Sequence, residues 1–324
     1  MFDLDGFSHA LMIIIGIIMY IFGFIGNLLN IRVFIRWSRS NLTVNEQNRT
    51  GNSSLYLLTT SIANLILIFY SLLVRILVDG YQHLVTDSND FLLCKFRYYI
   101  LQTSLIISLI CVCMATFDRY LITSRSVHLR QLSTTRRTTI RIILFIIVVS
   151  SLHSIPIGIY YVKSIVGDCI IISSSYSNYY LYFVIVFFYG IFPICFLSIF
   201  GLLTYKQIQS IQRTTSSNRH TNIDKQISQM ILCQCVALVS SYIPYCIQHI
   251  YFAKFVDKTI YPSGFNLLFR IITIILFYVN PVTSFYIFCL STPNFRKEVK
   301  KILCFRRLNQ RNQIRTLTVE AQHH

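Results

Sequence analysis

Long apolar runs separated by short polar and basic stretches recur along the 324-residue chain. A run of about 20 apolar residues is long enough to cross the hydrocarbon core of a bilayer as an α-helix. We therefore expect spanning helices at residues 10–35, 54–78, 91–123, 139–162, 178–206, 225–253 and 265–290. The pattern predicts an all-α membrane protein whose main domain, residues 10–292, is a seven-helix bundle.

Short segments flank this domain. Residues 1–9 carry Asp3 and Asp5 but no basic residue, so we expect an extracellular N-terminus and not a cleavable signal. Residues 305–324 are polar and are expected to form a cytoplasmic tail.

The stretch PNFRKEVKKILC, residues 293–304, alternates apolar and basic positions with a helical period. Phe295 and Val299 oppose Lys297 and Lys300, which predicts an amphipathic helix 8 lying on the inner leaflet and touching membrane lipids. Cys304 at its end is a candidate for palmitoylation, with a plain reduced cysteine as the alternative.

Lys and Arg are unevenly distributed among the connections. They concentrate in residues 36–54, 124–141 and 206–225 and in the tail from residue 296, while the other connections hold few. Because basic loops stay on the cytoplasmic side, we expect the N-terminus outside and the tail inside, in a multi-pass protein of the plasma membrane.

Composition narrows the class further. Only 13% of residues are charged and 54% are hydrophobic, which excludes an ordinary soluble domain. The net charge of +17 could suggest nucleic acid, but the basic residues lie between the apolar runs, so no nucleic-acid partner is expected.

Catalytic and metal-binding patterns are not apparent in the sequence. The ten cysteines show no zinc-type clustering, and no His-Glu-x-x-His motif or pair of catalytic acids falls in a span. We expect no metal, no cofactor and no enzyme activity. A transporter or channel would need an internal repeat or polar residues that line a path across the membrane. This class is the lowest-ranked alternative.

One stretch has a distinctive order: CKFRYYILQTSLIISLICVCMATFDRY, from Cys94 to Tyr120. An apolar helix that ends in Asp-Arg-Tyr resembles the third helix of rhodopsin-like G-protein-coupled receptors. Gly26-Asn27 and the prolines of the later spans are similar to that family as well. The phrases GNLLNIRVF, NSSLYLLTTSIANL, VNPVTSFYIF and FRKE resemble invertebrate FMRFamide-like neuropeptide receptors.

The resemblance implies a heterotrimeric G protein as partner. It implies that Arg119, between Asp118 and Tyr120, is held in the inactive state by Asp118 and by Asp224 at the foot of helix 6. The alternative for Asp224 is a solvated loop acid. The resemblance also implies a disulfide between Cys94 and Cys169.

A set of core switch residues follows from the same resemblance: Asn27, Asn64, Ser108, Pro244, Asn280 and Pro281. The chain departs from the family at Asn64, where an aspartate normally holds a sodium ion with groups such as Ser108. Because Asn64 is neutral, we expect weak sodium binding or none. Tyr242 stands where the family usually has a tryptophan.

A ligand pocket is expected at the outer ends of helices 3, 5, 6 and 7. Its candidate residues are Arg75, Leu101, Gln102, Leu105, Tyr242, Tyr245, His249, Arg270 and Tyr278. Leu101 replaces the aspartate of amine receptors and cannot pair an ammonium. Arg75 and Arg270 either extend to lipid head groups or form a site for a carboxylate or a peptide carbonyl.

Acidic residues in the outer loops could steer a basic peptide or simply be solvated: Asp79, Asp87, Asp90, Asp168 and Asp257. Our first hypothesis is a receptor for a short extracellular neuropeptide. The alternative is a chemoreceptor of the same fold for a small anionic or lipid ligand.

Overall fold

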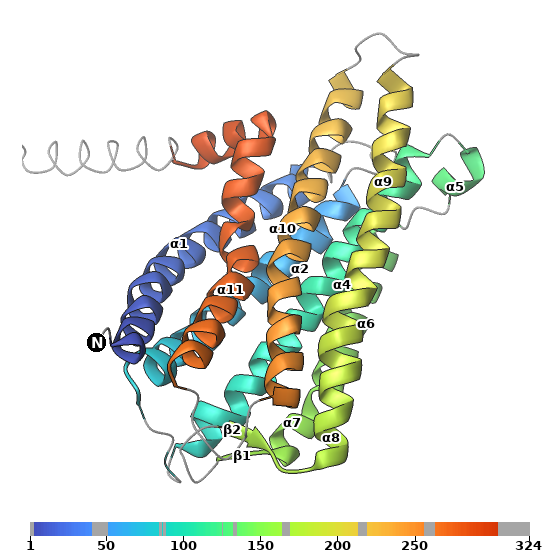
Figure 1. The fold of residues 1–324 in the computed structure, drawn as a ribbon. Helices are drawn as coiled ribbons and strands as arrows, with labels where there is room; N and C mark the ends of the chain where they lie inside the picture. The colour runs from blue at the N-terminus through green and yellow to red at the C-terminus, as the bar shows by residue number, and fades with distance from the viewer. Residues whose placement is uncertain are drawn as a thin grey trace, which may run out of the picture.

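The computed structural model in Figure 1 describes most of the chain, namely residues 3–40, 51–83, 86, 89–124, 126–131, 135–163, 169–212, 219–255 and 263–303. In this part of the chain, seven helical spans are long and apolar enough to cross a membrane: Leu4–Arg39, Asn52–Gly80, Phe91–Thr123, Arg136–Tyr160, Ser174–Gln207, Ser228–Phe255 and Phe265–Ser291. The predicted seven-helix bundle is confirmed, and the chain is a multi-pass membrane protein.

Several spans are built from more than one helical element, in which η denotes π-helical turns. The first is α1 (Leu4–Ser40), and the second joins α2 (Gly51–Ile66), η1 (Leu67–Leu72), α3 (Leu73–Arg75) and η2 (Ile76–Gly80). The third joins η3 (Phe91–Phe96) to α4 (Arg97–Thr123), and the short α5 (Val127–Gln131) follows it.

The fourth span joins α6 (Arg136–His153) to α7 (Ile155–Tyr160). The fifth joins α8 (Ser174–Tyr179), η4 (Tyr180–Ile191) and α9 (Phe192–Gln212). The sixth is α10 (Arg219–Phe255), and the seventh is α11 (Phe265–Ser291).

The third span is the central element of the bundle. In its most apolar stretch 78% of the residues are buried inside the protein, against 28% for the fourth span. Apolar side chains on the outer spans therefore face lipid, which is as favourable for them as a protein core. The stretch from Cys94 to Tyr120 runs through the middle of the bundle, where it can contact several neighbouring helices at both ends.

The first helix begins earlier than the sequence pattern indicates. We expected it at residue 10, but α1 begins at Leu4. The backbone N–H of Gly6 donates to the carboxylate of Asp3 at 3.1 Å, which satisfies one of the free N–H groups of the first turn. Residues 4–9 thus belong to the bundle and not to a separate N-terminal segment.

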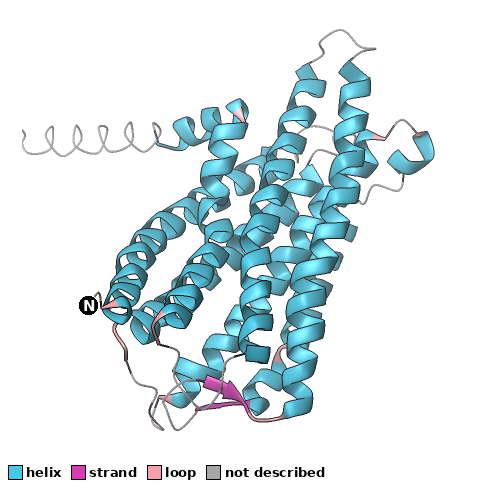
Figure 2. Cartoon of the chain, in the orientation of Figure 1, coloured by secondary structure: helices cyan, strands magenta, loops and turns pink. Residues whose placement is uncertain are grey.

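Two short strands interrupt the helical fold (Figure 2), where an all-α chain was expected. β1 (Tyr161–Lys163) pairs antiparallel with β2 (Cys169–Ile171), with Tyr161 opposite Ile171. The fourth helix was expected to continue to residue 162 but ends at Tyr160. Tyr-Val-Lys and Cys-Ile-Ile favour extended backbone, and each strand satisfies the other's backbone groups once the chain leaves the helix.

A further helix covers residues 293–303 and lies across the end of the bundle opposite the strands (Figure 1). Its Phe295 is fully buried among aromatic rings of α1 and α11, with ring centroids 5.8 Å away at Trp37 and at Phe288. Arg36 of α1 also lies 3.7 Å from Glu298. Cys304 and the tail at 305–324 lie outside the described residues.

Phe295 should therefore fix this helix to the bundle. We expect Phe295→Ala to lower the free energy of unfolding by about 3 kcal/mol, because it removes a fully buried aromatic ring. Unfolding of the purified protein in mixed detergent micelles measures the change. Leu303→Ala, at a half-exposed position of the same helix, is the control and should have little effect. Equal losses for both variants would contradict the anchoring role.

Candidate functional site

A disulfide joins Cys94, at the start of the third span, to Cys169 in β2. This confirms the expected pairing. The bridge fastens the two-stranded hairpin to the central helix, and Cys94 is fully buried beneath it. We refer to this end of the bundle as the disulfide end and to the end that holds Arg119 as the arginine end.

A cavity of about 340 Å³ opens at the disulfide end, beneath the hairpin. Its wall is formed by the hairpin and by residues of the second, third, fifth, sixth and seventh spans. Among the predicted pocket residues, Arg75, His249 and Arg270 line it. The other predicted residues are buried outside this wall: Leu101, Gln102, Leu105, Tyr242, Tyr245 and Tyr278.

An aromatic column leads from the cavity wall into the bundle. The ring of His249 lies 4.2 Å from that of Tyr245, which lies 4.4 Å from Phe277. Phe277 in turn lies 5.4 Å from Tyr242, close to Pro244 in the chain. The column connects the cavity to the middle of the sixth and seventh spans, which hold the predicted switch residues Pro244, Asn280 and Pro281.

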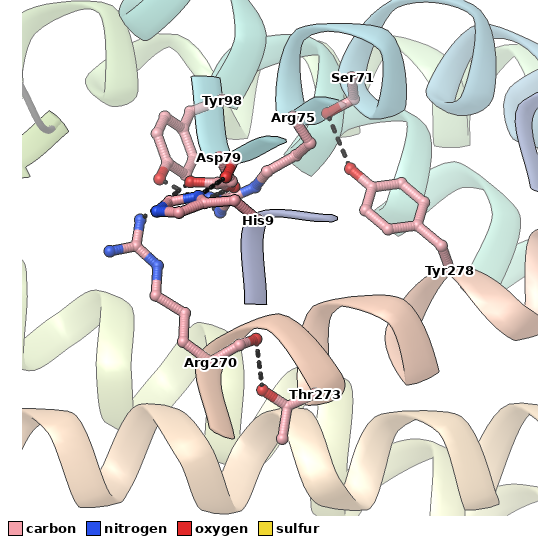
Figure 3. Close-up of polar contacts among 8 residues, drawn as sticks. All are labelled: His9, Ser71, Arg75, Asp79, Tyr98, Arg270, Thr273 and Tyr278. Atoms are coloured by element: carbon pink, nitrogen blue, oxygen red, sulfur yellow. Dashed lines mark hydrogen bonds and ion pairs between the residues drawn. The ribbon is translucent and has the colours of Figure 1, made fainter. Parts of the chain in front are cut away.

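Asp79 joins the two arginines of the cavity wall (Figure 3). Its carboxylate lies 2.7 Å from Nη1 of Arg75 and 3.5 Å from Nη2 of Arg270. The expectation that Asp79 belongs to an outer loop is wrong, because it lies in η2 and is 1% exposed. Arg75 is buried as well, so it does not extend to lipid head groups. The spacing of four residues between Arg75 and Asp79 was the sequence signal for this pair.

Neighbouring side chains hold this ion cluster in place (Figure 3). Nδ1 of His9 donates to the backbone carbonyl of Asp79 at 2.6 Å, so α1 contributes to it. Nη2 of Arg75 donates to the hydroxyl of Tyr98 at 3.5 Å. The hydroxyl of Tyr278 donates to Ser71 at 3.3 Å, which places this predicted pocket residue beside the cluster.

Arg97 is a third arginine at the disulfide end and was not among the predicted pocket residues. It is 1% exposed, and its guanidinium carbon lies 4.5 Å from the centre of the Tyr98 ring. None of its three guanidinium nitrogens has a hydrogen-bond partner among the described residues. Lys95, Tyr98 and Tyr99 around it are residue types common at a membrane interface, so the sequence pattern gives no sign that Arg97 is buried.

At the arginine end, Ser53 of α2 joins the two charged residues of the triplet. Its hydroxyl donates to Asp118 and accepts a hydrogen bond of 2.9 Å from Nε of Arg119. Arg119 is fully buried, while the ring of Tyr120 packs against Phe200 at 5.3 Å. The side chain of Asp224 lies outside the described residues, although α10 includes its position.

Polar side chains also meet in the middle of the bundle. Ser108 donates to the amide oxygen of Asn64 at 2.8 Å, and Gln234 donates to Asn280 at the same distance. Asn27 donates to the backbone carbonyl of Pro281 at 2.9 Å, an interaction across the first and seventh spans. Direct links between helices are thus formed by five predicted switch residues, Asn27, Asn64, Ser108, Asn280 and Pro281, and by Gln234, which was not predicted.

The comparison with known families agrees with this architecture. The family model described as 7 transmembrane receptor (rhodopsin family) matches residues 40–284, well over half of the chain. No match was found among the curated proteins. Together with the seven spans, the match shows that the chain belongs to the rhodopsin family of seven-transmembrane receptors.

Proposed function

We propose that this receptor binds a short extracellular peptide in the cavity at the disulfide end and activates a heterotrimeric G protein at the arginine end. Signalling through G proteins follows from the family. The positive-inside pattern supports placing the disulfide end outside the cell, with the N-terminus. That side is also the oxidising one, where a disulfide persists.

The cavity is the observation that carries the proposal. Its volume of about 340 Å³ suits one or two residues of a peptide, and it is lined by aromatic rings and by side-chain amides. Gln248 in the wall is 5% exposed, and its amide oxygen has no hydrogen-bond partner among the described residues. A buried acceptor of this kind suits the N–H group of a peptide backbone.

The second candidate function is a chemoreceptor for a small anionic or lipid ligand. The basic residues of the wall favour it, because Arg75, Lys254 and Arg270 line the cavity while no aspartate or glutamate does among the described residues. Both candidates share the same fold and the same route to the G protein.

A second-messenger screen tests the proposed function directly. Cells that express the chain are challenged with short amidated neuropeptides while calcium and cyclic AMP are followed. We expect a response that disappears in Arg119→Ala, because this residue is the proposed contact with the G protein. Silence to every peptide, with the protein shown at the cell surface, would contradict the peptide proposal and favour the chemoreceptor.

Ser53 should restrain basal signalling, since it bonds both Asp118 and Arg119. Losing about 1 kcal/mol of hydrogen bonding in Ser53→Ala should shift the equilibrium toward the active state about fivefold. Ligand-free G-protein activation measures this shift. Thr59→Ala is the control, because among the described residues that hydroxyl bonds only Leu55 of its own helix. Unchanged basal activity in Ser53→Ala would refute the restraint.

Asn64→Asp should create sodium sensitivity, because it places an anionic oxygen beside Ser108 in the middle of the bundle. We expect sodium chloride, but not choline chloride, to lower basal nucleotide exchange on the G protein in this variant. Asn30→Asp is the matched control, as Asn30 is an equally buried amide that donates to Ser284. A folded Asn64→Asp receptor that ignores sodium would show that this position is not the ion site.

A further inference from the structure

One polar side chain in the wall of the cavity has an unused hydrogen-bond acceptor. Gln248 of α10 lines the cavity and is 5% exposed. Its amide oxygen, Oε1, is buried and has no hydrogen-bond partner in the part of the chain that the structure describes. A buried acceptor without a partner is unfavourable, so this atom gains when a ligand brings a donor to it.

Neighbouring donors of the wall bond to other acceptors. Nη1 of Arg75 donates to the carboxylate of Asp79 at 2.7 Å. Nδ1 of His249, the next residue along the helix, donates to the backbone carbonyl of Tyr245 at 3.1 Å. Neither of these groups reaches Oε1 of Gln248. The acceptor is therefore left to the ligand.

The surroundings of this acceptor favour a donor without charge. The amide of Gln248 is itself neutral, so it does little to offset the dehydration of a ligand ammonium. Arg75 and Arg270 line the same cavity, and a guanidinium stays protonated in proteins. They repel a cation, although Asp79 between them offsets part of their charge. An amide N–H group meets the acceptor without this repulsion.

Aromatic rings form another part of the wall: those of Tyr98, Tyr161, Tyr180 and Phe252. The ring of Tyr161 lies 4.4 Å from that of Tyr98 and 5.9 Å from that of Tyr180. Such rings pack well against an aromatic or apolar group. A ligand that suits the whole cavity thus carries a group of this kind close to its N–H.

We propose that Gln248 sets the specificity of the receptor by accepting a hydrogen bond from an uncharged amide N–H of the ligand, next to an aromatic or apolar group. This inference rests on the proposed function in that the cavity is the ligand site, and it names the chemical class that the site selects. Esters, fully methylated amides and amines of the same shape are then poorer ligands.

The hydrogen bond also determines where the ligand lies. Gln248 directly precedes His249, the first ring of the aromatic column, and both residues line the cavity. A ligand held by Gln248 is therefore close to the cavity end of the column that leads to Phe277 and Tyr242.

Four probes with one skeleton test the inference on the purified full chain in lipid nanodiscs. N-methyl-3-phenylpropanamide has an amide N–H, and methyl 3-phenylpropanoate has an oxygen in its place. N,N-dimethyl-3-phenylpropanamide keeps the amide carbonyl without an N–H, and protonated N-methyl-3-phenylpropylamine donates from a cation. The thermal unfolding midpoint, followed over a range of probe concentrations, gives each affinity. We expect the secondary amide to bind about tenfold more tightly than each of the others.

Variants locate this preference. Gln248→Met keeps the approximate volume but removes the acceptor, so it should reduce the preference for amide over ester to about twofold or less. The ligand-free receptor should remain at least as stable, because the lost acceptor had no partner. Asn178→Leu is the matched control, since Asn178 is an exposed carboxamide of the same wall, and it should keep the preference. A purely structural role for Gln248 would lower stability and leave the amide-to-ester ratio unchanged.

Several results would overturn the inference. These are equal affinities for amide and ester, no stabilisation by the amide at any concentration, and an unchanged preference in Gln248→Met. Gln248→Leu provides the same comparison if Gln248→Met does not fold.

The cellular screen separates this inference from the proposed function. Peptides that activate the Gln248→Met receptor as potently as the unmodified one would leave the proposed function standing and refute the inference alone. Silence to every peptide in cells, with the amide preference intact in the purified receptor, would count against the proposed function alone.

Discussion

Hydrocarbon offers no hydrogen-bond partner, and most of this structure follows from that constraint. Backbone groups within the membrane must bond one another, so the spans are helical from end to end. Side-chain amides and hydroxyls inside the bundle must also find partners on other helices. The links from Asn64 to Ser108 and from Gln234 to Asn280 satisfy this need, and they determine which helices face one another.

The same constraint shapes the two ends of the bundle in parallel ways. At the arginine end, a neutral hydroxyl of Ser53 lies between an acid and a base that are adjacent in sequence. At the disulfide end, an acid lies between two bases from different spans. Each arrangement uses a small number of buried polar atoms to join helices, and removing Asp79 would take away the buried counter-charge that lies 2.7 Å from Arg75.

The spans could be predicted from local composition, and the disulfide from the family resemblance. The sequence did not predict the partners of the charged residues, which depend on how helices are rotated about their axes. Asp79 was assigned to a loop because it lies near a polar stretch, yet the second span continues past its predicted end at residue 78 to Gly80, and Asp79 is 1% exposed. Ser53 had no distinguishing signal, since its role arises only when α2 packs against α4.

Smaller differences have local causes that the sequence does contain. Asp3 is a favourable residue for a helix start, and this signal was available before α1 was seen to begin at Leu4. The strands at Tyr161 and Cys169 have extended-chain propensities, but three residues are too few to outweigh an adjoining apolar helix in a pattern analysis. For α1 only the boundary was misjudged, whereas the two strands were not predicted at all.

The bulk and the charge of a ligand should act on different parts of this receptor. Bulk acts on the aromatic column, which runs from His249 through Tyr245 and Phe277 to Tyr242. Rings packed at these distances resist compression, so a ligand that displaces the first ring also displaces the rings behind it. The size of this displacement depends on the bulk of the ligand and not on its charge. The ion cluster, by contrast, responds to charge. A series of ligands of equal charge but increasing bulk would then bind with similar strength while differing in efficacy, from antagonist to full agonist.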